Sequence, residues 1–346
     1  MKGPRTPFLL KLFNLYNGFL VLYLIIRAIF GAAWWWLGLL NTFALWLFMP
    51  LLLLIPFALL LKGKRSAALG LFLALIGFWK LAPLAERFPS DAAHDIRVLT
   101  FNVWKDNEMI SDTVDWILKQ DADVLILEEF IEAHDSELPR LLKVYPFHIY
   151  VAGNVKLLSR YPFLDSEILR IEESNWEHDG RLALRAVLDV DGQAISVYGV
   201  HLNLPRKDDF HFGLETEIWP FSFFLRYDET RRNEQIRNLA ALIAQDPNPI
   251  ILAGDFNTSH TSTILEEFRA AGLLDSFTQV GDNWGMTWPY TSDMRPMIRI
   301  DYVWASPKLY PLRLERGSFQ GSDHLPLIAD FALPDESLVV AHLKND

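Results

Sequence analysis

Several polar side chains in this chain of 346 residues stand at the ends of short, fully apolar runs. Val124–Leu127 is followed closely by Glu129, and Ile250–Ala253 is followed closely by Asp255. Strand ends in a packed scaffold are rigid places from which such groups can converge on one point. The set that we expect to converge holds four carboxylates, two amides and two imidazoles: Asn102, Glu129, His201, Asp255, Asn257, Asp301, Asp323 and His324.

The ligand types in this set indicate a hard divalent cation. Oxygen ligands with few nitrogens suit Mg²⁺ or Mn²⁺ rather than Zn²⁺. The chain has no cysteine, which excludes disulfides and thiolate metal sites. Mg²⁺ keeps several waters and usually takes one or two protein carboxylates. We therefore predict Mg²⁺ as the cofactor, with Mn²⁺ able to substitute, held mainly by Glu129 with Asp323 or Asn102 assisting.

The remaining side chains fit hydrolysis at phosphorus. A bound cation polarises a phosphoryl oxygen, a base readies a water, and hydrogen-bond donors meet the charge that develops. Asp255 can orient or deprotonate the water. Asn257, His201 and His324 can donate to phosphate oxygens. Asp301 can hold His324 in one tautomer and favour its protonated form.

The motifs around these residues occur in a distinctive order. They are Thr100-Phe101-Asn102-Val103, Glu129 after an apolar run, Val200-His201-Leu202, Gly254-Asp255-Phe256-Asn257, Arg299-Ile300-Asp301-Tyr302-Val303 and Gly321-Ser322-Asp323-His324-Leu325-Pro326, with Ser159-Arg160-Tyr161-Pro162 as a further match. This order resembles the endonuclease/exonuclease/phosphatase superfamily, which includes DNase I-like nucleases, neutral sphingomyelinases and inositol polyphosphate 5-phosphatases. The resemblance covers about residues 97–333, nearly the whole chain after its apolar front.

The resemblance implies a four-layer α/β sandwich and magnesium-dependent phosphoester hydrolysis. It makes Glu129 the metal ligand, with Asn102 and Asp323 nearby. It assigns Asp255 and Asn257 to the water and phosphate, and His201 to the phosphate. It also pairs Asp301 with His324 as a dyad, and it leaves open whether Asp255 or His324 is the base.

Each motif taken singly has an ordinary structural explanation. Asp-Phe-Asn after a strand is typical of a turn, Glu129 alone fits a helix cap, and an isolated His201 is more often a structural histidine. Their joint occurrence in the expected order favours a site. An inactive relative is the more serious alternative, although every expected polar position is filled.

The apolar runs also predict the fold that positions these residues. Fully apolar runs flanked by polar residues are typical of strands buried on both faces. Helical spacing predicts helices at 108–119, 229–245 and 261–271 that cover the outer faces. We therefore expect an α/β fold, a four-layer sandwich of two packed, mostly antiparallel sheets flanked by helices, preceded by an all-α transmembrane segment.

The front of the chain differs sharply in composition. Up to residue 90 it holds one acidic residue against nine Lys or Arg, while the rest holds 42 acidic and 23 basic residues, a net charge of −19. Apolar stretches at about 8–30, 32–61 and 67–84 approach the roughly 20 residues that a bilayer core requires. We predict a membrane anchor over 1–90 and a catalytic domain over 91–346. Buried core helices or a cleaved signal peptide fit this length poorly.

The basic residues predict an orientation in the membrane. Those at the start of the chain and those at 62–65 are separated by two crossings, so both lie on the cytoplasmic face. A third crossing then places the catalytic domain on the extracytoplasmic side of the plasma membrane. The third stretch is the weakest of the three, because it is short and carries Lys80.

The stretch from Leu204 to Tyr227 follows His201 and carries several aromatic residues among charges. We predict that it grips a lipid substrate, with a packed lid as the alternative. The leading function is hydrolysis of a phosphoester or pyrophosphate on a membrane lipid, as the resemblance to membrane-anchored bacterial members of the superfamily also implies. The bilayer is the expected partner. The alternatives are a tethered extracellular nuclease, which the acidic balance disfavours, and a catalytically inactive membrane scaffold.

Overall fold

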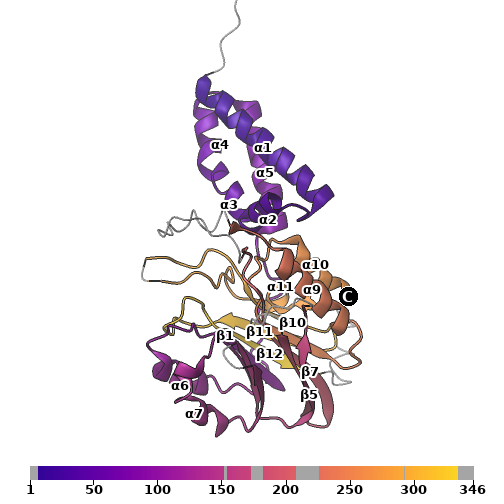
Figure 1. The fold of residues 1–346 in the computed structure, drawn as a ribbon. Helices are drawn as coiled ribbons and strands as arrows, with labels where there is room; N and C mark the ends of the chain where they lie inside the picture. The colour runs from indigo at the N-terminus through magenta and orange to yellow at the C-terminus, as the bar shows by residue number, and fades with distance from the viewer. Residues whose placement is uncertain (1–6, 152–153, 173–181, 208–225, 292, 334–346) are drawn as a thin grey trace, which may run out of the picture. The chain divides into compact units, whose positions relative to one another are not determined.

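The computed structural model describes residues 7–151, 154–172, 182–207, 226–291 and 293–333 (Figure 1). These residues form two compact units. One contains the chain up to Ala82 together with two later segments, 206–228 and 259–264; the other contains the remainder. The boundary between them at residue 82 lies near the predicted end of the anchor, but the two later segments were not part of that prediction.

The second unit contains two six-stranded sheets. The first has the strand order β11-β12-β1-β2-β4-β3 and the second β5-β6-β7-β8-β10-β9. Their bounds are β1 Ile96–Asn102, β2 Val124–Glu128, β3 Phe147–Val151, β4 Val155–Ser159, β5 Phe163–Arg170, β6 Leu182–Val190, β7 Gln193–His201, β8 Ile250–Asp255, β9 Leu274–Asp275, β10 Asp301–Ala305, β11 Tyr310–Arg316 and β12 Leu327–Ala332. The β1–β2 and β7–β8 pairs are parallel and the other strand pairs are antiparallel.

The main hydrophobic core lies between the two sheets. Side chains such as Val98 and Ile126 of the first sheet share it with Leu184, Val197 and Ile251 of the second, all fully buried. A strand buried on both faces has no polar face to show, which is why these runs are apolar throughout. The predicted α/β sandwich is therefore confirmed, with sheets of mixed direction.

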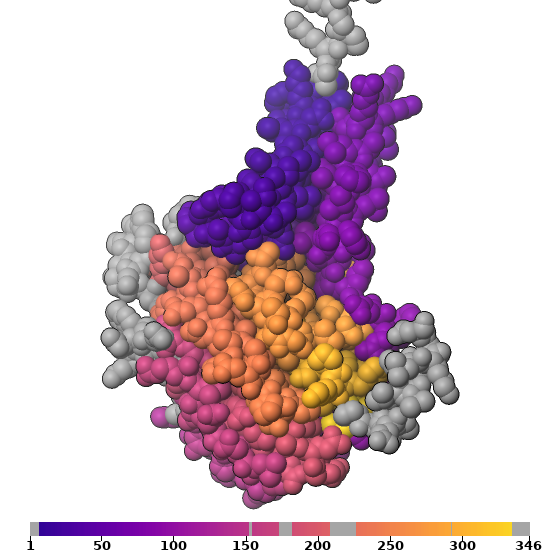
Figure 2. All heavy atoms as spheres, turned by 90° about the vertical axis from the view of Figure 1, so that its right-hand side faces the viewer, coloured from indigo at the N-terminus to yellow at the C-terminus, as the bar shows by residue number. Residues whose placement is uncertain are grey.

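Helices cover the outer faces of the sheets. On the first sheet, α6 (Ile110–Lys119) and α7 (Leu138–Leu142) lie side by side and bury Val114, Ile117 and Leu141 against β1 and β2 (Figure 1). On the second sheet, the atoms of α9 (Thr230–Ile243) and α10 (Glu266–Ala270) form much of the face that Figure 2 shows in orange. The short α11 (Ser276–Val280) packs near β10 and β11.

Two of the three predicted helices agree closely with α6 and α9. The third, expected over 261–271, is α10, which begins only at Glu266 after a 3₁₀ turn over Thr263–Leu265. The residues before this turn belong to the unit that contains the chain up to Ala82, which we call the helical unit. Helical spacing alone did not predict this division, because it depends on contacts with residues far away in the sequence.

The other unit is built from α1 (Phe8–Phe30), α2 (Trp35–Thr42), α3 (Ala44–Phe48), α4 (Leu51–Leu60) and α5 (Lys64–Leu81). It has a core of its own that includes Leu20, Leu37 and Leu51. Gly77 of α5 permits close packing there, since a Cβ at this position would lie 2.4 Å from the Phe48 ring. Many apolar side chains point outward instead, among them Leu15 at 71% and Leu53 at 80% exposure.

Among the described residues, α1 is long and apolar enough to cross a membrane. The stretch predicted as a second span is broken, because α2 and residues 44–60 meet at a 75° bend. Asn41 and Thr42 lie at this break, and their buried side chains hydrogen-bond to Gly31 and Tyr227. Counting the bent pair as one span gives up to two spans among the described residues, and α5, which covers most of the third predicted stretch, is not one of them. Most of the aromatic insertion after His201 lies outside the described residues.

Candidate active site

The sheet registers bring the predicted residues to one edge of the sandwich. In the second sheet, His201 of β7 and Asp301 of β10 both stand opposite Asp255 of β8. In the first sheet, Asn102 at the end of β1 stands opposite Glu128 at the end of β2. Because strands of both sheets end here, side chains that are up to 222 residues apart in the chain become neighbours.

Gly254 allows Asp255 to take its place beside His201. Its φ is +144°, and a Cβ there would lie 1.9 Å from the carbonyl oxygen of Val200 on β7. Only glycine tolerates both this conformation and this approach. The glycine of the Gly-Asp-Phe-Asn motif therefore has a steric role that sets the position of the carboxylate after it.

Asn102 links the two sheets. Its Nδ2 donates to Asp255 Oδ2 at 3.0 Å and to Glu129 Oε1 at 3.2 Å. Its Oδ1 accepts from the backbone N–H of Trp104 at 3.0 Å, which fixes the amide orientation. Two of the three predicted metal ligands, Asn102 and Glu129, thus form one hydrogen-bonded group with the predicted catalytic carboxylate of Asp255.

Asp301 and His324 form the predicted dyad. His324 Nδ1 lies 3.0 and 3.1 Å from the two Asp301 oxygens, and His324 Nε2 lies 3.7 Å from Asp255 Oδ2. Although burial opposes it, the charges of Asp301 and Asp255 raise the pKa of His324 to about 10. At neutral pH the imidazole is therefore a cation that can donate from Nε2.

Asp255 is almost completely buried, at 1% exposure. Burial, together with repulsion from Asp301, raises the pKa of the Asp255 carboxyl to about 7. The backbone N–H of Asn257 donates to its Oδ1 at 2.8 Å, which leaves Oδ2 facing Asn102 and the two imidazoles. A carboxylate with a pKa near neutrality is suited to accept a proton from water.

His201 lies close to the same carboxylates. Its Nε2 lies 3.7 Å from Asp255 Oδ2 and 3.8 Å from Glu129 Oε1. Its Nδ1 hydrogen-bonds with Asn154 Oδ1 at 2.8 Å. Asn154 was not among the predicted residues, and its only sequence signal is its place just before the apolar strand β4.

Asn257 takes a strained backbone conformation, with φ at +48°. Its Nδ2 donates to the carbonyl oxygen of Leu202 at 2.8 Å, so this amide also anchors the chain that follows His201. Arg232 of α9, which is 1% exposed, donates from Nη1 to the Asn257 carbonyl oxygen at 2.6 Å. Arg232 was not predicted, since a basic residue in an α-helix carries no signal of this contact.

The adjacent residues Glu128 and Glu129 have different environments. Glu128 is fully buried and accepts a hydrogen bond from Thr100 Oγ1 at 2.9 Å. Burial, with the charges of Asp301 and Asp255, raises its pKa well above the usual range. Glu129 has a positive φ of 56°, and its carboxylate is partly exposed. Although burial opposes it, the charge of His201 and the N–H donors of Lys105 and Asn102 lower its pKa, so Glu129 is the ionised one.

Asp323 directly precedes His324 in the segment between β11 and β12. Its Oδ2 accepts a 3.0 Å hydrogen bond from Trp288 Nε1, a donor that the sequence did not reveal. Burial is the main cause that raises the pKa of Asp323, and repulsion from Glu129 adds to it. Ser322 Oγ ties this loop to β1 by donating to the Asn102 carbonyl oxygen at 2.7 Å.

The donor set fits a divalent cation. Within the described part of the chain, the ion pairs made by Glu129, Asp255 and Asp301 come from the imidazoles of His201 and His324. Buried carboxylates with raised pKa values gain from a nearby cation, which relieves their mutual repulsion. Asp255, Asp301 and His324 also place one ligand atom each within 4.8 Å of one another. Because Asp301 and His324 already bond to each other, we favour Glu129, Asp323 and Asn102 as the ligands.

Known proteins resemble this chain over the same region. A family model described as "Endonuclease/Exonuclease/phosphatase family" matches residues 99–324. The "Uncharacterized protein YbhP" of Escherichia coli (strain K12) is 25% identical over 281 residues. That match covers 68% of this chain and 96% of YbhP.

Solved structures share the fold of the second unit. The endonuclease/exonuclease/phosphatase from Bacteroides vulgatus matches with a TM-score of 0.56 and 17% identity, over 69% of this chain and 99% of that one. D. rerio TDP2 complexed with single strand DNA product matches with a TM-score of 0.52 and 19% identity, over 68% and 98%. At these identities the likeness establishes a common fold.

Proposed function

Because this chain belongs to the endonuclease/exonuclease/phosphatase family, a family of divalent-metal-dependent phosphoesterases and nucleases, we propose that it is a membrane-tethered phosphoesterase acting on a membrane lipid. The observation that carries the proposal is the convergence of Asn102 and Asp255, at the ends of β1 and β8, with His324, whose Nε2 lies 3.7 Å from Asp255 Oδ2. The reaction is hydrolysis of a phosphoester or pyrophosphate by attack of water on phosphorus.

Glu129, Asp323 and Asn102 would hold Mg²⁺, with Mn²⁺ as a substitute. When bound there, the ion supplies Lewis-acid polarisation of a phosphoryl oxygen and screens the phosphate from the carboxylates. Trp288 and Lys105 orient the two carboxylates through their N–H groups. Such supporting hydrogen bonds keep metal ligands in position before the ion arrives.

Asp255 is the base in this proposal. Its Oδ2 accepts a proton from the attacking water while the water oxygen forms a bond to phosphorus and the bond from phosphorus to the leaving oxygen breaks. His324 is less suited to this role, because Asp301 holds it in the protonated form. The His324 cation and His201 instead donate to the phosphoryl oxygens as negative charge develops on them.

A lipid substrate is supported by the helical unit. The helix α1 is long and apolar enough to cross a membrane, and its outward side chains include Phe8 at 72% exposure. A tether of this kind keeps the enzyme at a bilayer, where lipid-linked phosphates are concentrated. We propose an orientation with the catalytic unit on the extracytoplasmic side and polyprenyl pyrophosphates, phospholipids or sphingolipid-like headgroups as substrates.

The test is release of phosphate or headgroup by the full chain in lipid vesicles. A panel of lipids and double- and single-stranded DNA would be compared with Mg²⁺, Mn²⁺, Zn²⁺ or EDTA present. The proposal expects lipid turnover that requires Mg²⁺ or Mn²⁺ and that Glu129→Ala and His324→Ala abolish. Asp91→Asn, at a side chain 94% exposed, is the control that should retain activity. Turnover of DNA without turnover of any lipid would identify a tethered nuclease instead.

A further inference from the structure

Residues 259–264 begin one residue after the Gly-Asp-Phe-Asn motif, yet they belong to the helical unit. Within that unit they lie in a buried hydrogen-bond cluster that we call the helix–loop cluster, formed by Arg27, Gly31, Asn41 and Thr261. Thr261 and Asn41 are 3% and 0% exposed. A simple membrane tether needs no such cluster, so its presence calls for a physical explanation.

Arg27 is the centre of the helix–loop cluster. It stands in the last turn of α1 and donates from Nη2 to the Thr261 carbonyl oxygen at 2.6 Å. It donates from Nη1 to Asn41 Oδ1 at 2.7 Å. Asn41 Nδ2 donates to the Gly31 carbonyl oxygen at 2.9 Å, and Thr261 Oγ1 donates to the Asn41 carbonyl oxygen. One guanidinium thus joins α1, α2 and the loop.

Two further contacts bring the same loop against helix ends. His260 Nε2 hydrogen-bonds to the carbonyl oxygen of Leu81, the last residue of α5, at 3.1 Å. Gly31, which ends α1 with a φ of +58°, approaches Thr263 so closely that a Cβ would lie 3.2 Å from its Oγ1. The C-terminal ends of α1, α2 and α5 therefore all contact the loop formed by residues 259–264.

The Arg27 contacts in this cluster are charge-assisted hydrogen bonds between distant parts of the chain. A charged side chain on an apolar helix is costly unless it faces partners inside the protein, and such residues usually have a function. Charge-assisted hydrogen bonds are about twice as strong as neutral ones. The partners of Arg27 lie 14 and 234 residues away, so the cluster fixes tertiary structure rather than the end of one helix.

The chain transmits this constraint over a very short distance. Thr258 is the one residue between Ser259 and Asn257, and two residues span at most about 7 Å. Asn257 is itself held in a left-handed conformation and its backbone N–H positions Asp255 Oδ1. If residues 259–261 moved farther than this short link can absorb, the backbone conformation at Asn257 would change.

We infer that Arg27 and Asn41 are positioning residues for catalysis: by fixing Thr261 they hold the loop that follows Asp255 and contains Asn257. The helical unit then does more than keep the enzyme at a bilayer, as the proposed function requires. It is needed for turnover even when the substrate is soluble and no membrane is present.

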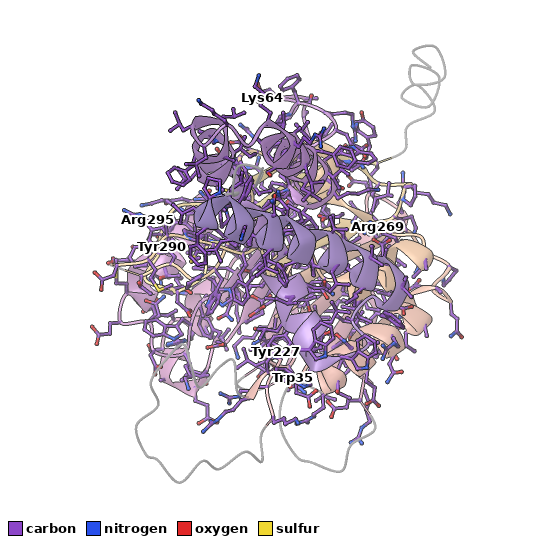
Figure 3. All side chains as sticks on the ribbon, turned by 90° about the horizontal axis from the view of Figure 1, so that it is seen from above. Trp35, Lys64, Tyr227, Arg269, Tyr290 and Arg295 are labelled. Atoms are coloured by element: carbon purple, nitrogen blue, oxygen red, sulfur yellow. The ribbon has the colours of Figure 1, made fainter. Side chains whose placement is uncertain are left out.

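The activity test uses the full chain in detergent with the soluble diester bis(p-nitrophenyl) phosphate. Arg27→Met should lower kcat by at least about 10-fold while KM changes less than about threefold, because the catalytic geometry and not substrate delivery is lost. Arg27→Lys should recover part of the loss. Lys64→Ala is the matched control: Lys64 is an exposed basic residue that lies across the helical unit from Trp35, the first residue of α2 (Figure 3). Unchanged kcat in Arg27→Met would overturn the inference.

A second measurement does not depend on activity. Hydrogen–deuterium exchange in the peptide covering residues 256–264 should be at least about 10-fold faster in Arg27→Met than in the wild type, because loss of the cluster frees the loop. Exchange there should be unchanged in Lys64→Ala. Equal exchange in the wild type and Arg27→Met would overturn the inference, whereas a wild type without phosphoesterase activity would overturn only the proposed function.

Two substitutions of Thr261 cover the case in which Arg27→Met fails to fold. Thr261→Ser keeps the hydroxyl that donates to the Asn41 carbonyl oxygen while removing a methyl group, and Thr261→Val removes the hydroxyl at nearly the same volume. Thr261→Ser should fold and keep kcat within about threefold, while Thr261→Val should lose about 10-fold because its hydroxyl bond is gone. Equal kcat in Thr261→Ser and Thr261→Val would also overturn the inference.

Discussion

Asp301 places both carboxylate oxygens 3.0 to 3.1 Å from Nδ1 of His324, so the imidazole is fixed in orientation and in charge. The same imidazole lies 3.7 Å from Asp255 through its other nitrogen. A carboxylate on each side favours the protonated form of His324 and, in the proposed mechanism, leaves Asp255 as the proton acceptor. This relationship decides the division of roles in the site and leads to the first prediction.

Asp301→Asn should lower kcat by about 10²–10⁴-fold, because an amide neither fixes the imidazole in one orientation nor favours its protonated form. The pKa of His324 should fall from about 10 toward its usual range, so the loss of activity at alkaline pH begins at a lower pH. The measurement is kcat against pH. An unshifted alkaline limb would contradict the assignment of His324 as the donor.

Asp255→Asn should abolish turnover and yet stabilise the metal-free protein. The folded-state pKa of Asp255, about 7, is above its unfolded value, so its contribution to stability is present at low pH and lost as pH rises through 7. In EDTA, the free energy of unfolding of Asp255→Asn should exceed that of the wild type by on the order of 1 kcal/mol at pH 8 and by less at pH 5. Thermal unfolding at both pH values measures it, and destabilisation at pH 8 would contradict the burial argument.

Glu128→Gln and Glu129→Gln should differ sharply although the two residues are adjacent. Glu128 is buried with a raised pKa, so it is protonated and its amide analogue should keep activity within about threefold. Glu129→Gln removes an ionised metal ligand and should lower activity by about 100-fold or more. Activity at saturating Mg²⁺ distinguishes them. A larger loss in Glu128→Gln than in Glu129→Gln would reverse the ligand assignment.

Trp288→Phe should weaken metal binding by about 10-fold, because it removes the N–H that orients Asp323. The Mg²⁺ concentration for half-maximal activity is the quantity to measure. Trp284→Phe makes the same chemical change at a tryptophan 46% exposed and should leave this concentration unchanged. An equal shift in both variants would indicate a general effect of losing an indole.

Arg295 and Tyr290, which follow Trp288 in the chain, form a cation–π pair. Arg295 lies with its Cζ 5.2 Å from the centre of the Tyr290 ring, and both residues lie together at one side of the view in Figure 3. Tyr290 donates its backbone N–H to the Asp323 carbonyl oxygen at 2.7 Å. Trp288 and Tyr290 thus both support Asp323, the first through its carboxylate and the second through its carbonyl oxygen.

The sequence by itself determined the residue types of the site and the fold class. Apolar runs that end in Glu129, His201 or Asp255 report strands buried on both faces, and oxygen ligands without cysteine indicate a hard cation. These are local properties, since the period of hydrophobic residues and the chemistry of a side chain can be read from the chain directly. The length and composition of α1 belong to the same class of signal.

The tertiary structure alone decided which groups support the predicted ones. Asn154, Arg232 and Trp288 act on residues 47, 25 and 35 positions away, and nothing in their local sequence reports those contacts. The tertiary structure also gave Glu128 and Glu129 different environments, because the burial of Glu128 and the positive φ of Glu129 are consequences of packing. The same holds for residues 259–264, where Thr261 accepts a hydrogen bond from Arg27 and donates one to the Asn41 carbonyl oxygen. Such contacts arise only when distant segments are brought together.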